Sequence, residues 1–467
     1  MPYRDLRDWI ERLEKEGELL RIREEISPEP DVGALGRATC DIEGPGILAE
    51  KITGFEGRLA TCLMASWRTT ALALDLPKDT SRRDMVKAWM DAFDRPAVKA
   101  KVVSDAPCKE NILTGEKIDL FQFPIPRINF NDASFYISKG MSITRDPDSD
   151  WTNVGIYRMM VLDRNRTAIH VTTPAQHFRF HIRKHYEAGK PMDVAVAIGT
   201  EPVLPMVAAM KIPGGWSEYD FAGTLREEPE ELVKAETIDL LVPARAEIVL
   251  EGVVHTDRQV FEGPFGEHTG AYSSCYWASA FEIKAITHRN NPIFESLYLG
   301  RPYSECNYLS MLGKIAGLQY ELQGKFPQIT EIAYQLPDLY NVVVQGRWGH
   351  TGEPKRVMSA FWGSSFGVPT KMVTVVDEDI DPWDAQDVLW AIATRCQASK
   401  DIVIIPGCEG ALDPSTEPDA TSCKLGIDAT KTRPPFHRHK TINWITPPRG
   451  TQEWKDKILQ LCQRGGN

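Results

Sequence analysis

The hydrophobic pattern of this chain changes near residue 305, and this change constrains the possible fold more than any other feature. From about 135 to 300, runs of β-branched and aromatic residues alternate with turn residues such as those at 163–166. This pattern predicts a series of strands, and several strands at this spacing favour a barrel or a sandwich. Beyond 305, strand and helix patterns alternate instead. Because the chain has 467 residues, two or three domains are expected.

The carboxy-terminal part predicts a parallel sheet. Residues 306–326 have the pattern of a connecting helix, and a final amphipathic helix at 452–463 would pack on this domain or on a neighbouring subunit. Between them, strand and helix patterns follow one another at 340–346, 354–364, 371–377, 384–395 and 401–407. This βαβαβ order implies parallel strands joined by right-handed crossovers.

The first part of the chain predicts a smaller mixed domain. Helical periodicity over 3–16 and 81–95 places large apolar side chains on one face of each helix, and 58–66 has the pattern of a strand. A proline-rich stretch at 120–128 follows this region. The predicted organisation is an amino-terminal mixed α/β domain, a strand-rich domain, a connecting helix and a carboxy-terminal α/β domain, over residues 1–115, 116–305, 306–326 and 327–467.

Charge, hydropathy and cysteine content argue against several classes of function. The formal net charge of −11 argues against nucleic acid or an anionic membrane as the main partner. No apolar run reaches 18 residues, and the amino terminus has the pattern of a charged helix rather than of a signal peptide. The nine cysteines are scattered without a C-x-x-C pair, which fits reduced thiols and predicts a cytoplasmic protein. No phosphate-binding loop, dinucleotide-binding glycine motif or G-x-S-x-G elbow is present.

The segment EGPFGEHTG at 262–270 holds two carboxylates five positions apart. Strict strand alternation would put Glu262 and Glu267 on opposite faces. The glycines of the turn can adopt backbone angles that other residues avoid, and its proline fixes one torsion, so the turn can direct both acids into one space. Two neighbouring carboxylates rarely both stay ionised, so one of them could hold a proton at neutral pH. The alternative is a solvated acidic loop.

Arg158 lies in the otherwise apolar segment WTNVGIYRMM. It needs an acidic partner because a guanidinium does not lose its proton, and a salt bridge between sheets would satisfy it equally well. Alternation puts Asn153 and Arg158 on opposite faces of a strand. A joint site would therefore require a bulge, for which Gly155 is the candidate position.

Three histidines recur every four residues in AQHFRFHIRKHYEAGK, on one face of a predicted helix. The spacing of His177, His181 and His185 resembles a row of metal ligands, although such rows are more often partly surface and partly core. His177 is the candidate ligand because it stands at the start of the helix. Glu218 follows a Gly-Gly turn and is, by itself, equally compatible with a surface acid.

Together these segments form a recognisable set: N-x-x-x-x-R at 153–158, Q-H at 176–177, S-E at 217–218 and E-G-P-F-G-E at 262–267. The set resembles the UbiD-type family of reversible decarboxylases, which use prenylated flavin mononucleotide. The likeness extends over most of the chain, and the stretch GIDATKTRP looks most like the branch acting on hydroxylated benzoates. The resemblance implies a central split β-barrel similar to flavin reductases, between an amino-terminal mixed domain and a carboxy-terminal α/β domain used in oligomerisation. Relatives are dimers or hexamers.

The resemblance also implies roles for individual residues. The ligands of a divalent ion, manganese or magnesium, that also holds the flavin phosphate match Asn153, His177 and Glu218. The catalytic network of the family, with the last residue as proton donor, matches Arg158, Glu262 and Glu267.

Further flavin-binding positions match Ile156, Tyr157, Gln176, Met210 and Lys371, in addition to Arg158 and the metal ligands. In relatives a monovalent cation, K⁺ or Na⁺, binds backbone carbonyls at positions near Val207 and Met210. Some relatives place a serine where Ala208 stands here.

The implied reaction is the reversible, non-oxidative decarboxylation of an aromatic acid, first of all a hydroxybenzoate. Glu267 would protonate the carbon that loses CO₂, Arg158 would hold the substrate carboxylate, and Glu262 would fix Arg158. This role requires a Glu267 pKa near the working pH. His437 or His439 could orient a ring hydroxyl, or either could have a surface role.

Two alternatives remain open at this stage. The substrate could be a heteroaromatic or acrylic acid, or the chain could be a non-catalytic, flavin-binding accessory subunit of a carboxylase complex. A flavin prenyltransferase is the expected supplier of the cofactor, and a homodimer or homohexamer is the expected assembly.

Overall fold

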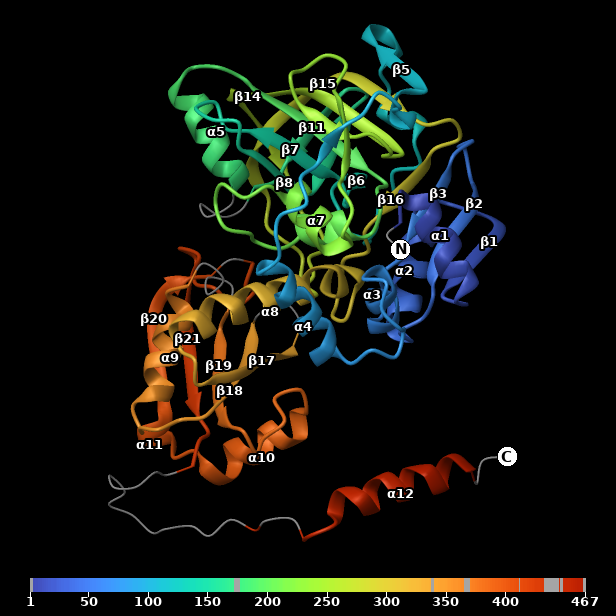
Figure 1. The fold of residues 1–467 in the computed structure, drawn as a ribbon. Coiled ribbons are helices and arrows are strands. Elements are labelled where there is room, and N and C mark those ends of the chain that lie inside the picture. The colour runs from blue at the N-terminus through green and yellow to red at the C-terminus, as the bar shows by residue number, and fades with distance from the viewer. Residues whose placement is uncertain are drawn as a thin grey trace.

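The computed structural model describes residues 3–171, 177–336, 340–364, 370–410, 412–431, 445 and 448–464. Figure 1 shows an amino-terminal α/β region in blue, a strand-rich centre in green and yellow, and a carboxy-terminal α/β domain in orange and red. The chain therefore has a multidomain α/β architecture. Within the described ranges, no helix combines the length and the apolar character needed to cross a membrane.

The amino-terminal sheet contains four strands in the order β1-β2-β3-β16. These are β1 (Leu19–Ile26), β2 (Gly46–Ile52), β3 (Arg58–Thr61) and β16 (Ile293–Ser296). The helices of this part of the chain are α1 (Leu6–Lys15), α2 (Asp31–Asp41), α3 (Trp67–Ala73) and α4 (Arg82–Phe93). α1 and α4 confirm the two predicted amphipathic helices, because their large apolar side chains are buried. β16 pairs with β3 in parallel, so a strand from beyond the central sheet completes this one.

The centre is one nine-stranded sheet in the order β6-β9-β10-β15-β14-β11-β7-β8, with β5 paired to β15. Its strands are β5 (Asn111–Thr114), β6 (Tyr136–Ile137), β7 (Met141–Arg145), β8 (Thr152–Ile156), β9 (Met159–Asp163), β10 (Arg166–Ile169), β11 (Met192–Ile198), β14 (Ile248–Glu262) and β15 (Tyr276–His288). Among the described strands, no pairing joins β6 to β8 and closes the path. The split barrel therefore stays a prediction. β14 and β15 form a long antiparallel hairpin.

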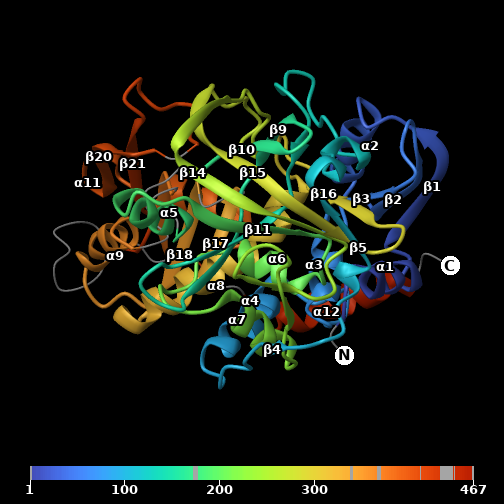
Figure 2. The same ribbon diagram turned by 90° about the horizontal axis from the view of Figure 1, so that it is seen from above.

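Shorter elements surround the central sheet. A three-stranded sheet contains β13 (Leu241–Pro243), β12 (Glu231–Lys234) and β4 (Lys101–Val102). The helices are α5 (His177–Glu187), α6 (Val203–Ala208) and α7 (Glu218–Arg226). Short 3₁₀ turns occupy Pro107–Lys109, Gly115–Lys117 and Leu120–Gln122. Figure 2 shows α5 on the side of the centre that faces the carboxy-terminal domain.

The carboxy-terminal sheet has five strands in the order β17-β18-β19-β21-β20. These are β17 (Ile329–Leu336), β18 (Asn341–Gly346), β19 (Met372–Asp377), β20 (Ile402–Glu409) and β21 (Thr421–Asp428). The helices are α8 (Glu305–Lys325), which joins this domain to the centre, α9 (Glu353–Trp362), α10 (Ala385–Arg395), α11 (Ala398–Asp401) and α12 (Thr451–Arg464).

The predicted βαβαβ order is wrong in its third strand. β18 and β19 are parallel, but the next parallel partner of β19 is β21, and β20 pairs antiparallel with β21 at the edge of the sheet. Most residues of β20 are partly or fully exposed, whereas the second half of β21 is largely buried. The better-buried strand therefore occupies the inner position, although its polar beginning hides the strand pattern in the sequence.

α12 lies apart from the rest of the chain (Figure 1). The side chains over 451–460 are exposed, and they include Trp454, Ile458 and Leu459. The structure thus does not show the predicted packing of this helix on its own domain. Packing on a neighbouring subunit stays a prediction.

Candidate active site

The ends of four neighbouring strands meet at one place in the central sheet. β9, β10, β15 and β14 are consecutive in the sheet order. Arg158 immediately precedes β9, and the backbone N–H of His170, just after β10, donates to the Arg158 carbonyl at 3.1 Å. Glu262 ends β14, where it is paired in register with Tyr276 at the start of β15. Four side chains from distant parts of the sequence are thereby brought to one edge.

The turn after β14 folds back tightly, and its glycines are required for this. Gly263 has φ of 93°, and a Cβ there would stand 2.7 Å from the Ser274 carbonyl oxygen. A Cβ on Gly266 would stand 2.3 Å from Asn129 Nδ2. The backbone N–H of Gly266 donates to Asp132 Oδ1 at 2.8 Å, which anchors the turn against the preceding loop. Glycine is therefore the residue that allows this close return of the chain.

Arg158 binds both acids of the turn. Its Nε and Nη2 donate to Glu262 Oε1 and Oε2 at 2.9 and 2.8 Å, and its Nη1 donates to Glu267 Oε1. Nη2 also donates to Ser273 Oγ at 3.0 Å, and the guanidinium lies 4.9 Å from the centre of the Phe265 ring. The carboxylate side chains are 0% and 8% exposed, which excludes the solvated acidic loop.

A break between β8 and β9, not a bulge, allows the side chains of Asn153 and Arg158 to contribute to neighbouring sites. β7 and β8 pair in continuous register through Gly155, so the predicted bulge at Gly155 is wrong. The chain instead leaves β8 after Ile156 and enters β9 at Met159. Because Arg158 lies in this irregular interval, strand alternation does not determine where its side chain points.

Both carboxylates of the turn stay ionised because cations and donors surround them. Burial by itself raises the pKa of Glu262, but hydrogen bonds from His170 and Arg158 outweigh burial and lower it to about 2. Burial likewise opposes the shift at Glu267, yet His268 and Arg158 hold its pKa below the ordinary value. The near-neutral pKa expected for Glu267 is therefore not found while Arg158 is bound to it.

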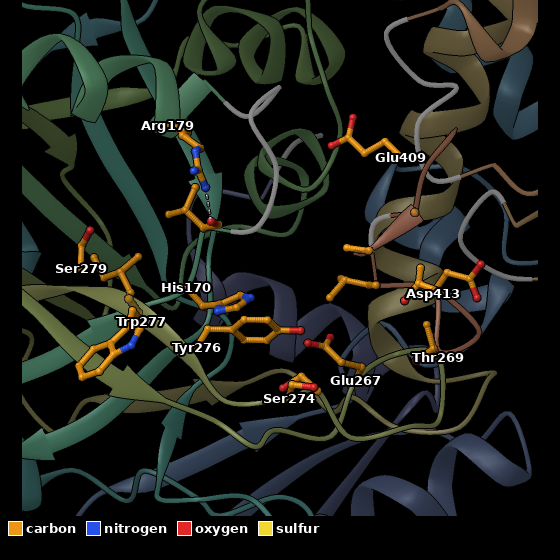
Figure 3. Close-up of a pocket in the computed structure, with 18 of the residues that line it drawn as sticks. His170, Arg179, Glu267, Thr269, Ser274, Tyr276, Trp277, Ser279, Glu409 and Asp413 are labelled. Carbon is orange, nitrogen blue, oxygen red and sulfur yellow. Dashed lines mark hydrogen bonds between the residues drawn. The ribbon is translucent and has the colours of Figure 1, made fainter. Parts of the chain in front are cut away.

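The Glu267 carboxylate faces a cavity of about 920 Å³ between the central sheet and the carboxy-terminal domain. His170, Tyr276 and Glu267 line it on the central side, and Glu409 and Asp413 on the other (Figure 3). The buried network is thus open to a space large enough for a ligand.

The predicted metal ligands also lie in one neighbourhood. Glu218 begins α7, and its Oε2 accepts the backbone N–H of Val154, the neighbour of Asn153, at 3.0 Å. Trp151 packs against the His177 ring with 4.8 Å between ring centres. Its Nε1 donates to the Trp216 carbonyl at 3.0 Å, two residues before Glu218.

These three side chains fit a divalent cation. Burial raises the pKa of Glu218 to about 8, as expected for a carboxyl group with no cation beside it. Burial, with the charge of Lys211, lowers the pKa of His177 to about 4, so its imidazole is neutral at pH 7, as a metal ligand must be. Asn153 is 3% exposed, and its Nδ2 has no hydrogen-bond partner in the described part of the chain. Within the described residues no group of three His, Cys, Asp or Glu side chains is suited to hold a metal, so a site here depends on the Asn153 amide.

The other two histidines of the predicted row have different surroundings. His181 is fully buried, and its Nδ1 bonds Thr144 Oγ1 at 2.9 Å. His185 Nδ1 bonds the Pro191 carbonyl at 3.1 Å. His181 also lies close to this neighbourhood, because its ring centre is 4.9 Å from that of Trp151, but its Nδ1 is bonded to Thr144, the register partner of Asn153.

The remaining predicted flavin positions that the structure describes lie in the central region and in the carboxy-terminal domain, and they are not among the residues that line the cavity. Ile156 and Tyr157 follow Asn153 along β8 and its end, and the Met210 N–H donates to the Val207 carbonyl at 3.2 Å after α6. Lys371 belongs to the carboxy-terminal domain, where its Nζ donates to Asp413 Oδ2 at 2.9 Å and to Ser415 Oγ. Gln176, His437 and His439 lie outside the described residues.

His170, Tyr136 and Ser273 were not among the predicted site residues, although all three bond the network. A signal for His170 existed. The turn at 163–166 sets a hairpin in which Met159 pairs with Ile169, so that Arg158 stands opposite His170. Tyr136 and Ser273 have no comparable local signal, because their contacts depend on the course of the loops.

Comparison with known proteins agrees with this geometry. Residues 10–89, 100–302 and 311–429 match, in turn, the N-terminal, Rift-related and C-terminal domain families of 3-octaprenyl-4-hydroxybenzoate carboxy-lyase. A phenolic acid decarboxylase from Sedimentibacter hydroxybenzoicus is 38% identical over 99% of this chain and 98% of its own length.

Solved structures give the same result. Vanillic acid decarboxylase from Sedimentibacter hydroxybenzoicus in closed form has a TM-score of 0.92 at 37% identity, covering 99% of both chains. An evolved dimeric form of the UbiD-class enzyme HmfF from Pelotomaculum thermopropionicum, in complex with prenylated FMN (prFMN), has a TM-score of 0.82 at 32% identity, covering 97% of this chain and 98% of that one. The similarity extends over all three regions of the fold, and the chain belongs to the UbiD family of carboxy-lyases.

Proposed function

We propose that this protein is a prenylated-FMN-dependent decarboxylase of aromatic acids, with a hydroxylated benzoate as its first substrate class. The observation that carries the proposal is the buried Arg158, held between Glu262 and Glu267 at the wall of a cavity. The names of the relatives, phenolic acid and vanillic acid decarboxylases, support the substrate class.

The residues of the network have distinct roles in this proposal. Glu262 receives both Nε and Nη2 of Arg158 and fixes the plane of the guanidinium. A substrate carboxylate that enters the cavity competes with Glu267 for Nη1 of Arg158. Once Glu267 loses this cation inside a buried site, its pKa rises and it takes up a proton. Glu267 then donates that proton to the carbon from which CO₂ has left.

Prenylated FMN, when bound, supplies the electron sink that makes loss of CO₂ from an sp² carbon possible. We assign its phosphate and a Mn²⁺ or Mg²⁺ ion to Asn153, His177 and Glu218, since oxygen ligands with one imidazole suit these ions. Ile156, Tyr157, Gln176, Met210 and Lys371 complete the flavin site in this proposal. Binding of K⁺ or Na⁺ at the carbonyls near Val207 and Met210 belongs to the same proposal.

The proposal also covers assembly, cofactor supply and location. We propose a homodimer or a homohexamer, a flavin prenyltransferase as cofactor supplier, and a split barrel, similar to flavin reductases, for the central sheet. The dimeric form of one relative supports the first of these. A cytoplasmic location is supported by the cysteines, because none of the eight whose side chains are described forms a disulfide.

The test is a substrate panel on protein co-produced with a flavin prenyltransferase. We expect CO₂ release from hydroxybenzoates, and carboxylation of the corresponding phenols under high CO₂. CO₂ release from pyrrole, furan or cinnamate-type acids alone would replace hydroxybenzoates as the proposed substrate class. Tight flavin binding without turnover of any acid would favour the accessory subunit and reject the enzyme.

A further inference from the structure

Glu262 accepts two hydrogen bonds that its pair with Arg158 does not account for. Its Oε1 accepts Arg158 Nε at 2.9 Å and the Tyr136 hydroxyl at 3.1 Å. Its Oε2 accepts Arg158 Nη2 at 2.8 Å and lies 2.9 Å from His170 Nδ1. Each carboxylate oxygen therefore has two donors, and His170 supplies the fourth.

The surroundings fix which nitrogen of His170 carries the proton. An ionised carboxylate only accepts hydrogen bonds, so Nδ1 must be the donor toward Glu262. In the neutral ring, Nε2 is then an acceptor. The His170 side chain is 8% exposed, and within the described residues Nε2 has no hydrogen-bond partner. The ring centres of Tyr276 and His170 are 5.1 Å apart. Figure 3 shows the two side chains next to each other in the pocket.

The backbone ties His170 to the residue that it would orient. The His170 N–H donates to the Arg158 carbonyl at 3.1 Å, across the hairpin formed by β9 and β10. Arg158 and His170 therefore reach Glu262 from adjacent strand ends, and the three residues form a closed ring of contacts. A fully satisfied buried network of this kind restricts the orientations of its members.

We propose that His170 is a positioning residue for decarboxylation: its Nδ1–H holds the Glu262 carboxylate in the rotation that presents both oxygens to Arg158. With Glu262 so held, the remaining edge of the guanidinium stays directed at Glu267 and at the substrate carboxylate. Without this donor, Glu262 rotates toward its remaining partners and Arg158 turns with it. The inference rests on the proposed function for its effect on turnover, but not for its geometry.

Two variants separate positioning from simple filling of space. His170→Leu fills much of the volume without a donor, and His170→Asn keeps an N–H near the place of Nδ1 while removing Nε2. We expect His170→Leu to lower kcat by about 10–100-fold, the scale of a misplaced catalytic group, with KM and flavin content little changed. His170→Asn should recover most of this loss.

The control is His255→Leu, which removes another histidine–glutamate pair of the same sheet, between His255 Nε2 and Glu282 Oε2 at 2.8 Å. This pair is not among the cavity-lining residues, so kcat should stay at the wild-type value. Wild-type kcat in His170→Leu, or an equal loss in His170→Leu and His170→Asn, would overturn the proposal.

A second measurement needs no turnover. ¹⁵N NMR of the histidine-labelled holoenzyme, with the His170 signals assigned by their absence in His170→Asn, reports which ring nitrogen carries the proton. We expect a proton on Nδ1, and a neutral ring protonated on Nε2 alone would overturn the inference. If the wild-type enzyme turns over no acid, the proposed function fails, whereas this result still decides whether His170 donates to Glu262.

Discussion

Among the buried clusters in which a cation lies between two glutamates, the clusters around Arg158 and Lys139 differ in their access to the cavity beside the central sheet. In the first, Arg158 binds Glu262 and Glu267 beside the cavity. In the second, Lys139 Nζ lies 2.7 Å from Glu295 Oε1 and 3.3 Å from Glu305 Oε1, and all three side chains are at most 4% exposed. The charges are alike, so the difference must lie in geometry and access.

The second cluster connects regions of the fold. Lys139 lies between β6 and β7, Glu295 is in β16, and Glu305 begins α8. The second oxygen of Glu305 accepts the backbone N–H groups of Cys62 and Tyr298 at 2.8 and 3.2 Å. Central sheet, amino-terminal sheet and connecting helix are thereby joined by one sealed ion cluster.

The acids also differ in their pKa. Burial raises the pKa of Glu295, although Lys139 opposes the shift. Glu262, which the fork of Arg158 and two further donors surround, has its pKa lowered to about 2. A planar guanidinium with several donors can hold two carboxylates and still be approached by a third, whereas an enclosed ammonium cannot. We infer that the Arg158 cluster allows its partners to exchange, whereas the Lys139 cluster stabilises the fold.

Glu267→Gln should have the largest effect, which is on kcat. The amide keeps the shape of the side chain but cannot donate a carboxylic proton, so we expect kcat to fall by about 10²–10⁴-fold. Flavin and metal content after purification should be unchanged. Glu295→Gln is the matched change in the sealed cluster and should leave kcat per folded molecule unaltered. Wild-type-like rates in Glu267→Gln would exclude Glu267 as the donor.

Lys139→Met tests the sealed cluster. It leaves two buried carboxylates without their cation, and we expect the free energy of unfolding to fall by about 3–5 kcal/mol in urea titrations. The control is Lys101→Met, which removes a surface pair with Glu231 and should cost less than about 1 kcal/mol. Equal effects in the two variants would contradict the structural role of Lys139.

His177→Ala tests a third buried acid, Glu218, which we propose to be balanced by a metal ion rather than by a side chain. Loss of one ligand should lower metal affinity by at least about 10–100-fold and remove flavin with it. Metal analysis and flavin absorbance of the purified protein measure both. His185→Ala, on the same helix, should keep them. Normal flavin absorbance in His177→Ala would refute the assignment.

The last expected effect is a pH dependence of the stability of the metal-free protein. The folded-state pKa of Glu218, about 8, lies above its ordinary value of 4.5, so the folded state binds its proton more tightly than the unfolded state does. This contribution to stability is complete below about pH 4.5 and is lost as pH rises toward 8. Added Mn²⁺ should reverse the trend, because the metal binds the ionised form. Glu218→Gln should lack this component in thermal melts from pH 5 to 8.

The turn at 262–267 shows why part of the site could be predicted. Glycine and proline carry their backbone preferences in any context, so convergence of Glu262 and Glu267 followed from local chemistry. The break between β8 and β9 could not be foreseen in this way, and alternation predicted a bulge at Gly155 instead.

Long-range contacts explain the other gaps. Nothing near Lys139 distinguishes a buried lysine from a surface one, because its two glutamates lie more than 150 positions away. The exchange of β20 and β21 has a similar cause, since local pattern does not determine which of two strands takes the inner place in a sheet. The strand order of the amino-terminal sheet also depends on β16, which follows the strands of the central sheet in the chain.

That strand, β16, has a consequence for synthesis. β3 is complete at residue 61, but its partner begins at residue 293. During synthesis, roughly 230 further residues must therefore be added, in about 10–50 s, before β16 can cover the edge of β3. We expect nascent chains stalled before residue 293 to be sensitive to protease and to bind chaperones through that edge. This exposure would end when the four residues of β16 emerge from the ribosome and pair with β3.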